Sequence, residues 1–434
     1  MFRRNWCGLP REVYFPSGLK ELGYFVNDED EIRSIANPDQ YFNFFLNRNP
    51  RVNLRQRFQF DTAVQSIVLE RLESLALHKI PLPPVEPGSG SRHVNIFISR
   101  DLGNAERIIV VFGERAKDFG MVAGRIADGP GGIEKGSMVG AVKAIQRRDS
   151  TAIILANMSE SYWSTEHKQA VTAEKSRALS MPSLVHLGIK YHPQLNSIPG
   201  SEDPLCHART VLNTVISQHA NKDAKINIIA IGDNCGVITS LLDEEDTWKT
   251  WGASLQGALF YNPAFYYEQK QGGLKDFLAK KSRGYAVSEH PLGTPLSGPD
   301  GNPDESIPRL GFPCYSAGEA RIGELCFVSA LEHGLSYLDE VARTPDFENP
   351  AIAIVERAAA TVVETEGEWD ALSPDQKPSV GTMDEDELQK QVKILRRWRH
   401  FEKTGHVPTS DDESDMDDER EGDSLPVKPW DEAP

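Results

Sequence analysis

Residues 225–240, KINIIAIGDNCGVITS, contain the turn that decides the fold of this chain. An apolar run with the character of a buried strand leads into GDNCG at 232–236, and a stretch of helical character follows. The arrangement matches the outline of a nucleophile elbow, G-x-S-x-G, in which a tight strand-to-helix turn lifts one side chain above the sheet. Gly232 and Gly236 keep the spacing of this motif, but Asn234 occupies the position of its serine.

The chemistry of position 234 argues against catalysis. An amide nitrogen is delocalised and has no acidic hydroxyl or thiol proton, so a neighbouring base cannot turn Asn234 into a useful nucleophile. Cys235 is one place off, and we expect it to point into the following helix. Two alternatives stay open: a displaced nucleophile such as Cys235, and an ordinary strand–turn–helix junction with no functional history.

A hydrolase triad also needs an acid and a histidine from later strands. Glu289 and His290 follow an expected strand at 284–288, and His333 lies within an expected helix at 331–342. These three residues are the candidates for a remnant acid and base. We interpret Glu289 and His290 as surface residues and His333 as a structural histidine, because no serine at 234 is present for them to activate.

The rest of the chain alternates between strand and helix patterns, which predicts a parallel sheet covered on both faces. The expected fold class is α/β: an α/β-hydrolase-like three-layer sandwich with a mostly parallel central sheet, plus C-terminal helices and a disordered acidic tail. The expected strands are 93–99, 107–113, 151–157, 225–232, 255–263, 284–288, 311–319 and 323–328, and the expected helices are 137–148, 204–220, 236–244, 273–281 and 331–342.

Composition predicts four parts. Residues 1–86 form an N-terminal segment with a long amphipathic helix at 53–77, and a Pro-rich linker begins at 81. The α/β-hydrolase-like body, the C-terminal helices and the disordered tail follow at 92–345, 346–403 and 404–434.

Charge and cysteine content exclude several classes. The net charge is −17, of which the nine acidic residues and one arginine of 410–424 supply −8, so the balance disfavours direct nucleic-acid binding. Five widely spaced cysteines without a CxxC pair predict neither a disulfide framework nor a metal site. The Gly-rich loop 128–138 does not meet the phosphate-loop pattern, and we expect no cofactor. No signal peptide or apolar run of membrane-spanning length is visible, so we expect a cytosolic or nuclear protein without membrane contact.

Two features near the C-terminus are open to functional interpretation. The basic strip KILRRWRH, 393–400, is either a nuclear import signal, an RNA contact, or the solvent face of a packed helix. Two serines precede runs of carboxylates and are candidate phosphorylation sites. The residues concerned are Lys393, Arg396, Arg397 and Arg399 in the strip, and Ser410 and Ser414 in the tail.

Several segments together resemble the fungal domain family named for the second Argonaute-binding protein, a subunit of the argonaute small-interfering-RNA chaperone complex. Related domains follow the deacetylase domain of fungal class II histone deacetylases. The resemblance covers roughly residues 10–345. The segments that carry it are FPSGLKELGYFVNDEDEIRSI (15–35), IIVVFG (108–113), GGIEKGSMVGAVKAI (131–145), GDNCG (232–236) and CYSAGE (314–319).

The resemblance implies a hydrolase-like fold used for protein–protein contacts in nuclear RNA silencing and heterochromatin. Some family members keep a serine in the elbow, and Asn234 is a departure from them. The leading hypothesis is therefore a non-catalytic scaffold or adaptor in the nucleus or nucleo-cytoplasm, with Argonaute or a chromatin-silencing factor as its protein partner. The alternatives are a serine- or cysteine-type esterase with a displaced nucleophile and a direct RNA-binding module that uses 393–400.

Overall fold

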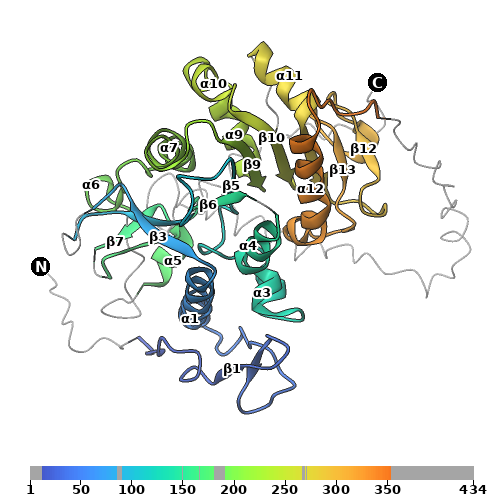
Figure 1. Ribbon diagram of the computed structural model, residues 1–434. Helices are drawn as coiled ribbons and strands as arrows, with labels where there is room; N and C mark the ends of the chain where they lie inside the picture. Colours follow the sequence, from blue (N-terminus) through green and yellow to red (C-terminus); the bar gives the residue numbers. More distant parts are fainter. Residues whose placement is uncertain are drawn as a thin grey trace, which may run out of the picture. The chain divides into compact units, whose positions relative to one another are not determined.

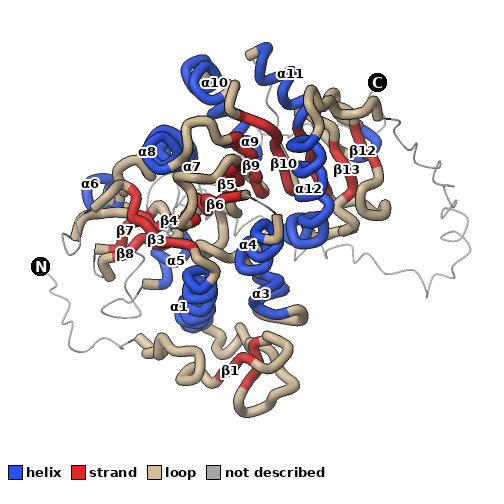
Figure 2. Tube along the Cα trace, in the orientation of Figure 1, coloured by secondary structure: helices blue, strands red, loops and turns tan. Residues whose placement is uncertain are grey.

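A nine-stranded sheet forms the centre of the computed structural model (Figures 1 and 2). Six neighbouring strands run parallel, while β4 is antiparallel to both of its neighbours and β12 is antiparallel to β13. In spatial order the strands are β12 (Pro295–Ser297), β13 (Cys314–Ser316), β11 (Ser282–Ala286), β10 (Leu255–Tyr261), β9 (Lys225–Ile231), β5 (Arg107–Phe112), β6 (Thr151–Ala156), β4 (Val94–Ser99) and β3 (Leu77–Leu82).

The chain divides into two compact units, Met1–Arg357 and Ala358–Pro434. The structure describes only parts of the first unit, namely residues 12–85, 90–148, 150–165, 167–179, 191–265, 269 and 271–352. The acidic tail and nearly all of the expected C-terminal helices lie outside these residues. No helix in the described ranges is long and apolar enough to cross a bilayer.

Strand β5 shows how the sheet is buried on both faces. Ile108, Val110 and Phe112 belong to the apolar cluster on one face, and Ile109 and Val111 belong to the cluster on the other. Successive side chains of a strand point to opposite faces, so an uninterrupted apolar run fits a strand covered on both sides. Each large apolar side chain that is fully buried stabilises the fold by roughly 1.5–3 kcal/mol.

Helices cover both faces, which confirms the predicted α/β-hydrolase-like three-layer arrangement (Figure 1). One face packs against α7 (Pro204–Thr210), a π-helical segment (Val211–Ile216) that continues into α8 (Ser217–His219), α9 (Asn234–Leu242), α10 (Glu245–Trp251) and α11 (Gly272–Lys281). The other packs against α1 (Pro50–Ser74), α4 (Met138–Gln146) and α12 (Cys326–Arg343). Shorter elements are α2 (Gly124–Ala127), α3 (Gly132–Gly136), β7 (Tyr162–Ser164), β8 (Gln169–Val171), α5 (Ala173–Ala178), α6 (Pro193–Asn196) and the 3-10 turns η3 (Pro303–Glu305) and η4 (Gly323–Leu325).

The N-terminal segment is part of the first unit. Its hairpin, β1 (Tyr24–Val26) and β2 (Ile32–Ser34), precedes α1, the predicted long helix. Asp30, in the turn between the two strands, accepts two hydrogen bonds from Arg71 of α1, at 2.9 and 2.6 Å, and one from the backbone N–H of Glu134 in α3, at 2.7 Å. These bonds fasten the hairpin to the helical layer beside the sheet.

Two predicted elements are wrong in part. The expected strand 323–328 is instead η4 followed by the first turn of α12. The reason is that Cys326, Phe327, Ala330 and Leu331 begin the buried face of that helix.

The expected linker at 81–87 begins inside a strand. Pro81 and Leu82 complete β3, where Pro81 pairs with Asn95 of β4. A proline has no N–H to donate, but β3 is the edge of the sheet, where that donor is not needed.

Candidate functional site

The turn between β9 and α9 reverses the chain at a glycine. Strand β9 ends at Ile231, and α9 begins at Asn234. Gly232 has φ +59°, in the left-handed region that favours glycine, whereas Asp233, the residue before the helix, is right-handed with φ −58°. The sharp bend therefore lies two residues before position 234, so that Asn234 is already the first helical residue.

The side chain at position 234 is consequently turned inward. Asn234 is fully buried, and its Nδ2 donates a 2.6 Å hydrogen bond to the carbonyl of Gly113, the residue after β5. Because the reversal occurs at Gly232, the side chain of Asn234 does not stand above the sheet as the middle residue of a nucleophile elbow does. Cys235 is fully buried with Sγ 3.4 Å from the carbonyl of Ala230, and burial raises the pKa of its thiol. The side chain of Asn234 thus ties the β9–α9 turn to the loop after β5.

A carboxylate covers the turn. A Cβ added at Gly232 would overlap Oε2 of Glu114, in the loop after β5. Burial raises the pKa of Glu114, while a hydrogen bond from the backbone N–H of Arg115 acts in the opposite direction. The cavity beside this loop, lined in part by Gly113 and Met138, measures about 10 Å³, which is room for about one water. A hydrolase would need N–H donors and open space for an oxyanion near this turn.

The remaining triad candidates make other contacts. Glu289 and His290 lie in the loop after β11, and His290 Nε2 is 3.5 Å from a carboxylate oxygen of Glu305. His333, on α12, places Nδ1 2.7 Å from the hydroxyl of Tyr285, and its pKa is lowered, mainly by burial. Among the described residues, the hydrogen bonds and ion pairs of His290 and His333 are to partners other than Asn234.

Other predicted sites cannot be placed. The basic strip, Lys393, Arg396, Arg397 and Arg399, and the candidate phosphoserines Ser410 and Ser414 all lie outside the described residues. Within the part of the chain that the structure describes, no three or more His, Cys, Asp or Glu side chains form a group that could hold a metal ion.

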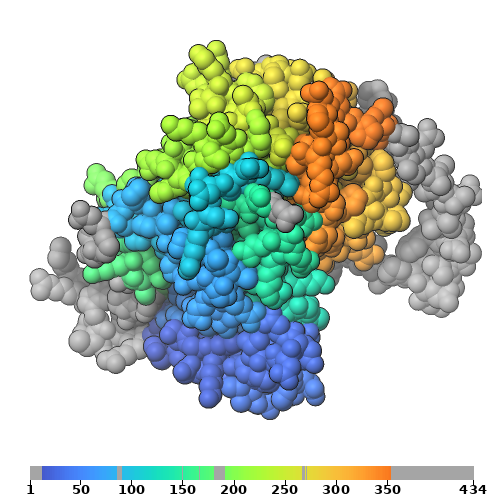
Figure 3. All heavy atoms as spheres, in the orientation of Figure 1, coloured from blue at the N-terminus to red at the C-terminus, as the bar shows by residue number. Residues whose placement is uncertain are grey.

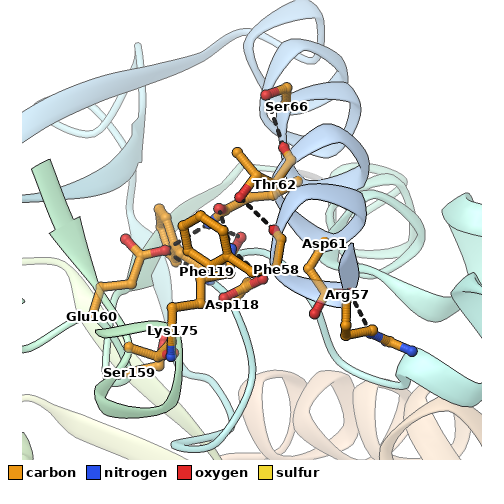
Figure 4. Close-up of polar contacts among 12 residues, drawn as sticks. Arg57, Phe58, Asp61, Thr62, Ser66, Asp118, Phe119, Ser159, Glu160 and Lys175 are labelled. Atoms are coloured by element: carbon orange, nitrogen blue, oxygen red, sulfur yellow. Dashed lines mark hydrogen bonds and ion pairs between the residues drawn. The ribbon is translucent and has the colours of Figure 1, made fainter. Parts of the chain in front are cut away.

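A polar cavity that the sequence did not indicate lies against α1. Figure 4 shows some of the side chains that line it, among them Arg57, Asp61 and Lys175. We call it the α1 cavity. Its volume is about 220 Å³, and its walls come from α1, from the segment 116–128 that includes α2, and from α5 with the residue before it. Apolar wall residues include Leu54, Phe58, Val64, Met121 and Ala178. The charged wall residues are Arg57, Asp61, Lys117, Asp118, Asp128, Glu174 and Lys175.

Ion pairs organise this cavity. Arg57 contacts two carboxylates: its Nε is 2.6 Å from Oδ1 of Asp61, and its Nη2 bonds to Asp128. Lys175 Nζ lies 2.5 Å from Oδ2 of Asp118. Burial raises the pKa of Asp61 to about 7; Arg57 works against this shift, and the neighbouring carboxylates of Asp118 and Asp128 add to it. Two acids thus share one guanidinium in a partly buried space.

A network of hydrogen bonds around buried Glu160 lies next to the cavity. Glu160 accepts hydrogen bonds from Gln65 Nε2 of α1 at 2.6 Å, from the backbone N–H of Phe119 at 3.3 Å, and from Asn157 Nδ2 at 2.8 Å. Gln65 also accepts a 3.4 Å bond from Lys175 Nζ. Burial raises the pKa of Glu160, although the bonds from Asn157 and Gln65 oppose this. The network joins α1 to the loop after β5 and to the segment after β6.

Comparison with known proteins shows the family to which the chain belongs. The Arb2 domain matches residues 15–292, which is more than half of the sequence. The chain belongs to the Arb2 domain family. The predicted resemblance is confirmed. The match includes β1, α1, every wall residue of the α1 cavity and the β9–α9 turn, whereas β13 and α12 lie beyond it.

Solved structures similar to this Arb2 domain include two histone deacetylases and an esterase-type enzyme. A histone deacetylase from Saccharomyces cerevisiae is 12% identical, with 64% of this chain and 96% of that chain covered and a TM-score of 0.37. The histone deacetylase Clr3 is 10% identical, with 65% and 39% covered and a TM-score of 0.37. LpqC, a poly(3-hydroxybutyrate) depolymerase from Bordetella parapertussis, is 12% identical, with 64% and 97% covered and a TM-score of 0.30. No curated protein matches the sequence.

Proposed function

We propose that this Arb2 domain is a non-catalytic adaptor that binds a protein of the small-RNA silencing or heterochromatin machinery in the nucleus or nucleo-cytoplasm. The observation that carries the proposal is the closed elbow. Asn234 is buried against Gly113, and Glu114 covers the turn where a nucleophile and an oxyanion would be needed. The partner class comes from the resemblance to the Argonaute-binding subunit, and the nuclear location follows from that partner.

The N-terminal segment offers a surface for such a partner. Eight of the twelve large apolar side chains that are exposed in the described ranges lie between residues 13 and 54. Figure 3 shows this segment, in blue, along the lower side of the view. Contiguous exposed apolar groups commonly mark a protein interface, and Phe44, Phe45 and Leu46 are consecutive exposed apolar residues of this segment. We call these eight residues the N-terminal apolar set: Val13, Tyr14, Phe25, Ile35, Phe44, Phe45, Leu46 and Leu54.

Part of this set is held in a fixed position. Buried Asn53, in the first turn of α1, accepts hydrogen bonds from the backbone N–H groups of Leu46, at 3.0 Å, and Asn47, at 2.9 Å, and donates to the carbonyl of Asn47 at 2.7 Å. The preceding Phe45 is 67% exposed. A loop that is already ordered loses less conformational entropy on binding than a free one.

Affinity capture from a nuclear extract tests the proposal. Tagged wild-type chain, Phe45→Asp and a matched control, Leu195→Asp, would be compared by quantitative mass spectrometry; Leu195 is 54% exposed on α6, outside the N-terminal segment. We expect silencing or chromatin proteins to be enriched by the wild type and the control and to be lost with Phe45→Asp. If no silencing or chromatin protein is enriched over an untagged sample, the proposed partner class is overturned. If Phe45→Asp recovers these proteins as well as the wild type does, the assignment of the N-terminal apolar set as the binding surface is overturned.

A further inference from the structure

The α1 cavity differs from the closed elbow in having room for a ligand. Its volume of about 220 Å³ is many times the roughly 10–15 Å³ that one water needs on the same measure. It combines an apolar wall with a charged one, which is how pockets for small groups are commonly built. Its charged wall decides which groups fit.

The cations of the wall are already engaged. Lys175 pairs with Asp118, Lys117 Nζ is 3.3 Å from Glu324, and the single guanidinium of Arg57 serves two carboxylates. The wall holds three cationic and four acidic side chains. Asp61 and Asp128 share the one guanidinium of Arg57, so an incoming cation would lower the cost of keeping both acids ionised.

We propose that the α1 cavity binds the guanidinium or ammonium head of a basic side chain on a protein partner. The head would pair with Asp61 and Asp128, which now share Arg57, and the aliphatic stem would lie along Leu54, Phe58 and Met121. An anion would be repelled by the carboxylates of the wall, and a neutral group would add no positive charge to the one guanidinium that Asp61 and Asp128 share.

The cavity adjoins the surface assigned to the partner. Leu54 belongs both to the cavity wall and to the N-terminal apolar set, and α1 carries it together with Arg57 and Asp61. One partner segment would thus place apolar groups on the N-terminal apolar set and one basic side chain in the cavity. This inference rests on the proposed function for its partner but not for its ligand chemistry.

Butylguanidinium is the probe, because it carries the head and a short stem alone. Binding to the full chain would be followed by NMR of ¹³C-methyl-labelled methionines, with Met121 as the reporter of the cavity. We expect saturable binding by the wild type and by Asp300→Asn, a control whose carboxylate is 83% exposed. Asp61→Asn keeps the shape of the side chain and removes its charge, and it should weaken binding about tenfold, as loss of a charged hydrogen-bond partner typically does.

A second measurement needs no variant and so does not depend on the folding of one. Binding to the wild type would be compared between butylguanidinium and n-pentanol, a neutral molecule of similar size, and butyrate. Isothermal titration at pH 6 in two buffers of different ionisation enthalpy would count protons. We expect release of a substantial fraction of a proton, because a bound cation lowers the pKa of Asp61 from its value of about 7. The charged groups around Asp61 are Arg57 on α1, Lys117 and Asp118 after β5, Asp128 after α2, and Glu174 and Lys175 on α5.

Each outcome decides the inference. Binding that is equal for pentanol, unchanged in a folded Asp61→Asn, or absent up to the solubility of the probe overturns it. Selective binding supports it even if nuclear capture fails, in which case only the partner class falls. If capture succeeds and selective binding is absent, the adaptor role stands and the cation site falls.

Discussion

Replacing Asp61 by asparagine should change how the stability of the domain depends on pH. The side chain is 26% exposed, and its pKa is raised from 3.8 to about 7 in the fold. The folded state therefore holds a proton that the unfolded chain has already released, so this group makes the fold less stable as pH rises from about 4 to about 7. A displacement of about three pKa units corresponds to about 4 kcal/mol, of which about 3 kcal/mol develops between pH 4.5 and 8.

Asp61→Asn lacks this titration, so the variant should gain stability relative to the wild type as pH rises. We expect the difference in the free energy of unfolding to grow by about 2–3 kcal/mol between pH 4.5 and 8, with water around the partly exposed carboxyl accounting for the lower figure. Urea unfolding of both proteins, followed by tryptophan fluorescence at each pH, measures it. Asp300→Asn, which removes a carboxylate that is 83% exposed, is the matched control. A difference for Asp61→Asn that is flat or falls with pH would refute the reasoning.

Three further predictions concern buried groups. Asn234→Ser should lose about 1–3 kcal/mol of stability, because the hydrogen bond to the loop after β5 is lost. The variant should not react with a fluorophosphonate probe, and labelling that requires the native fold would restore the esterase alternative. Cys7 lies outside the described residues and is replaced by serine for the next test. In this Cys7→Ser background, iodoacetamide should modify partly exposed Cys206 in the native protein and buried Cys235 only on unfolding, as peptide mapping would show. Burial lowers the pKa of His207 to about 4, and its Nε2 accepts a backbone N–H. This group alone contributes about 3 kcal/mol of stability that develops between pH 4 and 6.5, so in urea titrations the wild type should gain about that much relative to His207→Asn over this range, and a constant difference would contradict the assignment.

The α/β layering was predictable because its strands carry a local signal. The apolar run at 107–113 ends in a glycine, and β5 covers Arg107–Phe112 as predicted. Buried parallel strands need apolar residues on both faces, so the pattern is visible without knowledge of the neighbours. The edge strand β3 was hidden because Pro81 is tolerated only at an edge, and edges are defined by the whole sheet.

The site was less predictable than the fold. The GDNCG spacing indicated the turn, but which residue takes positive φ was not visible, and that residue decides where Asn234 points. For the α1 cavity the available signal was Arg57 and Asp61, spaced i and i+4 on a helix that also carries a buried apolar face. Its other charged walls come from two distant segments, and no local spacing rule joins them.

Hydrogen exchange of the purified chain, alone and with the partner that nuclear capture identifies, tests the central claim most directly. If the domain acts through its N-terminal segment and not through the elbow, exchange should slow at residues 42–57, which hold Phe44 to Leu46 and the first turns of α1. Exchange at 232–240, the β9–α9 turn and most of α9, should be unchanged. Protection centred on 232–240 with none at 42–57 would contradict the account.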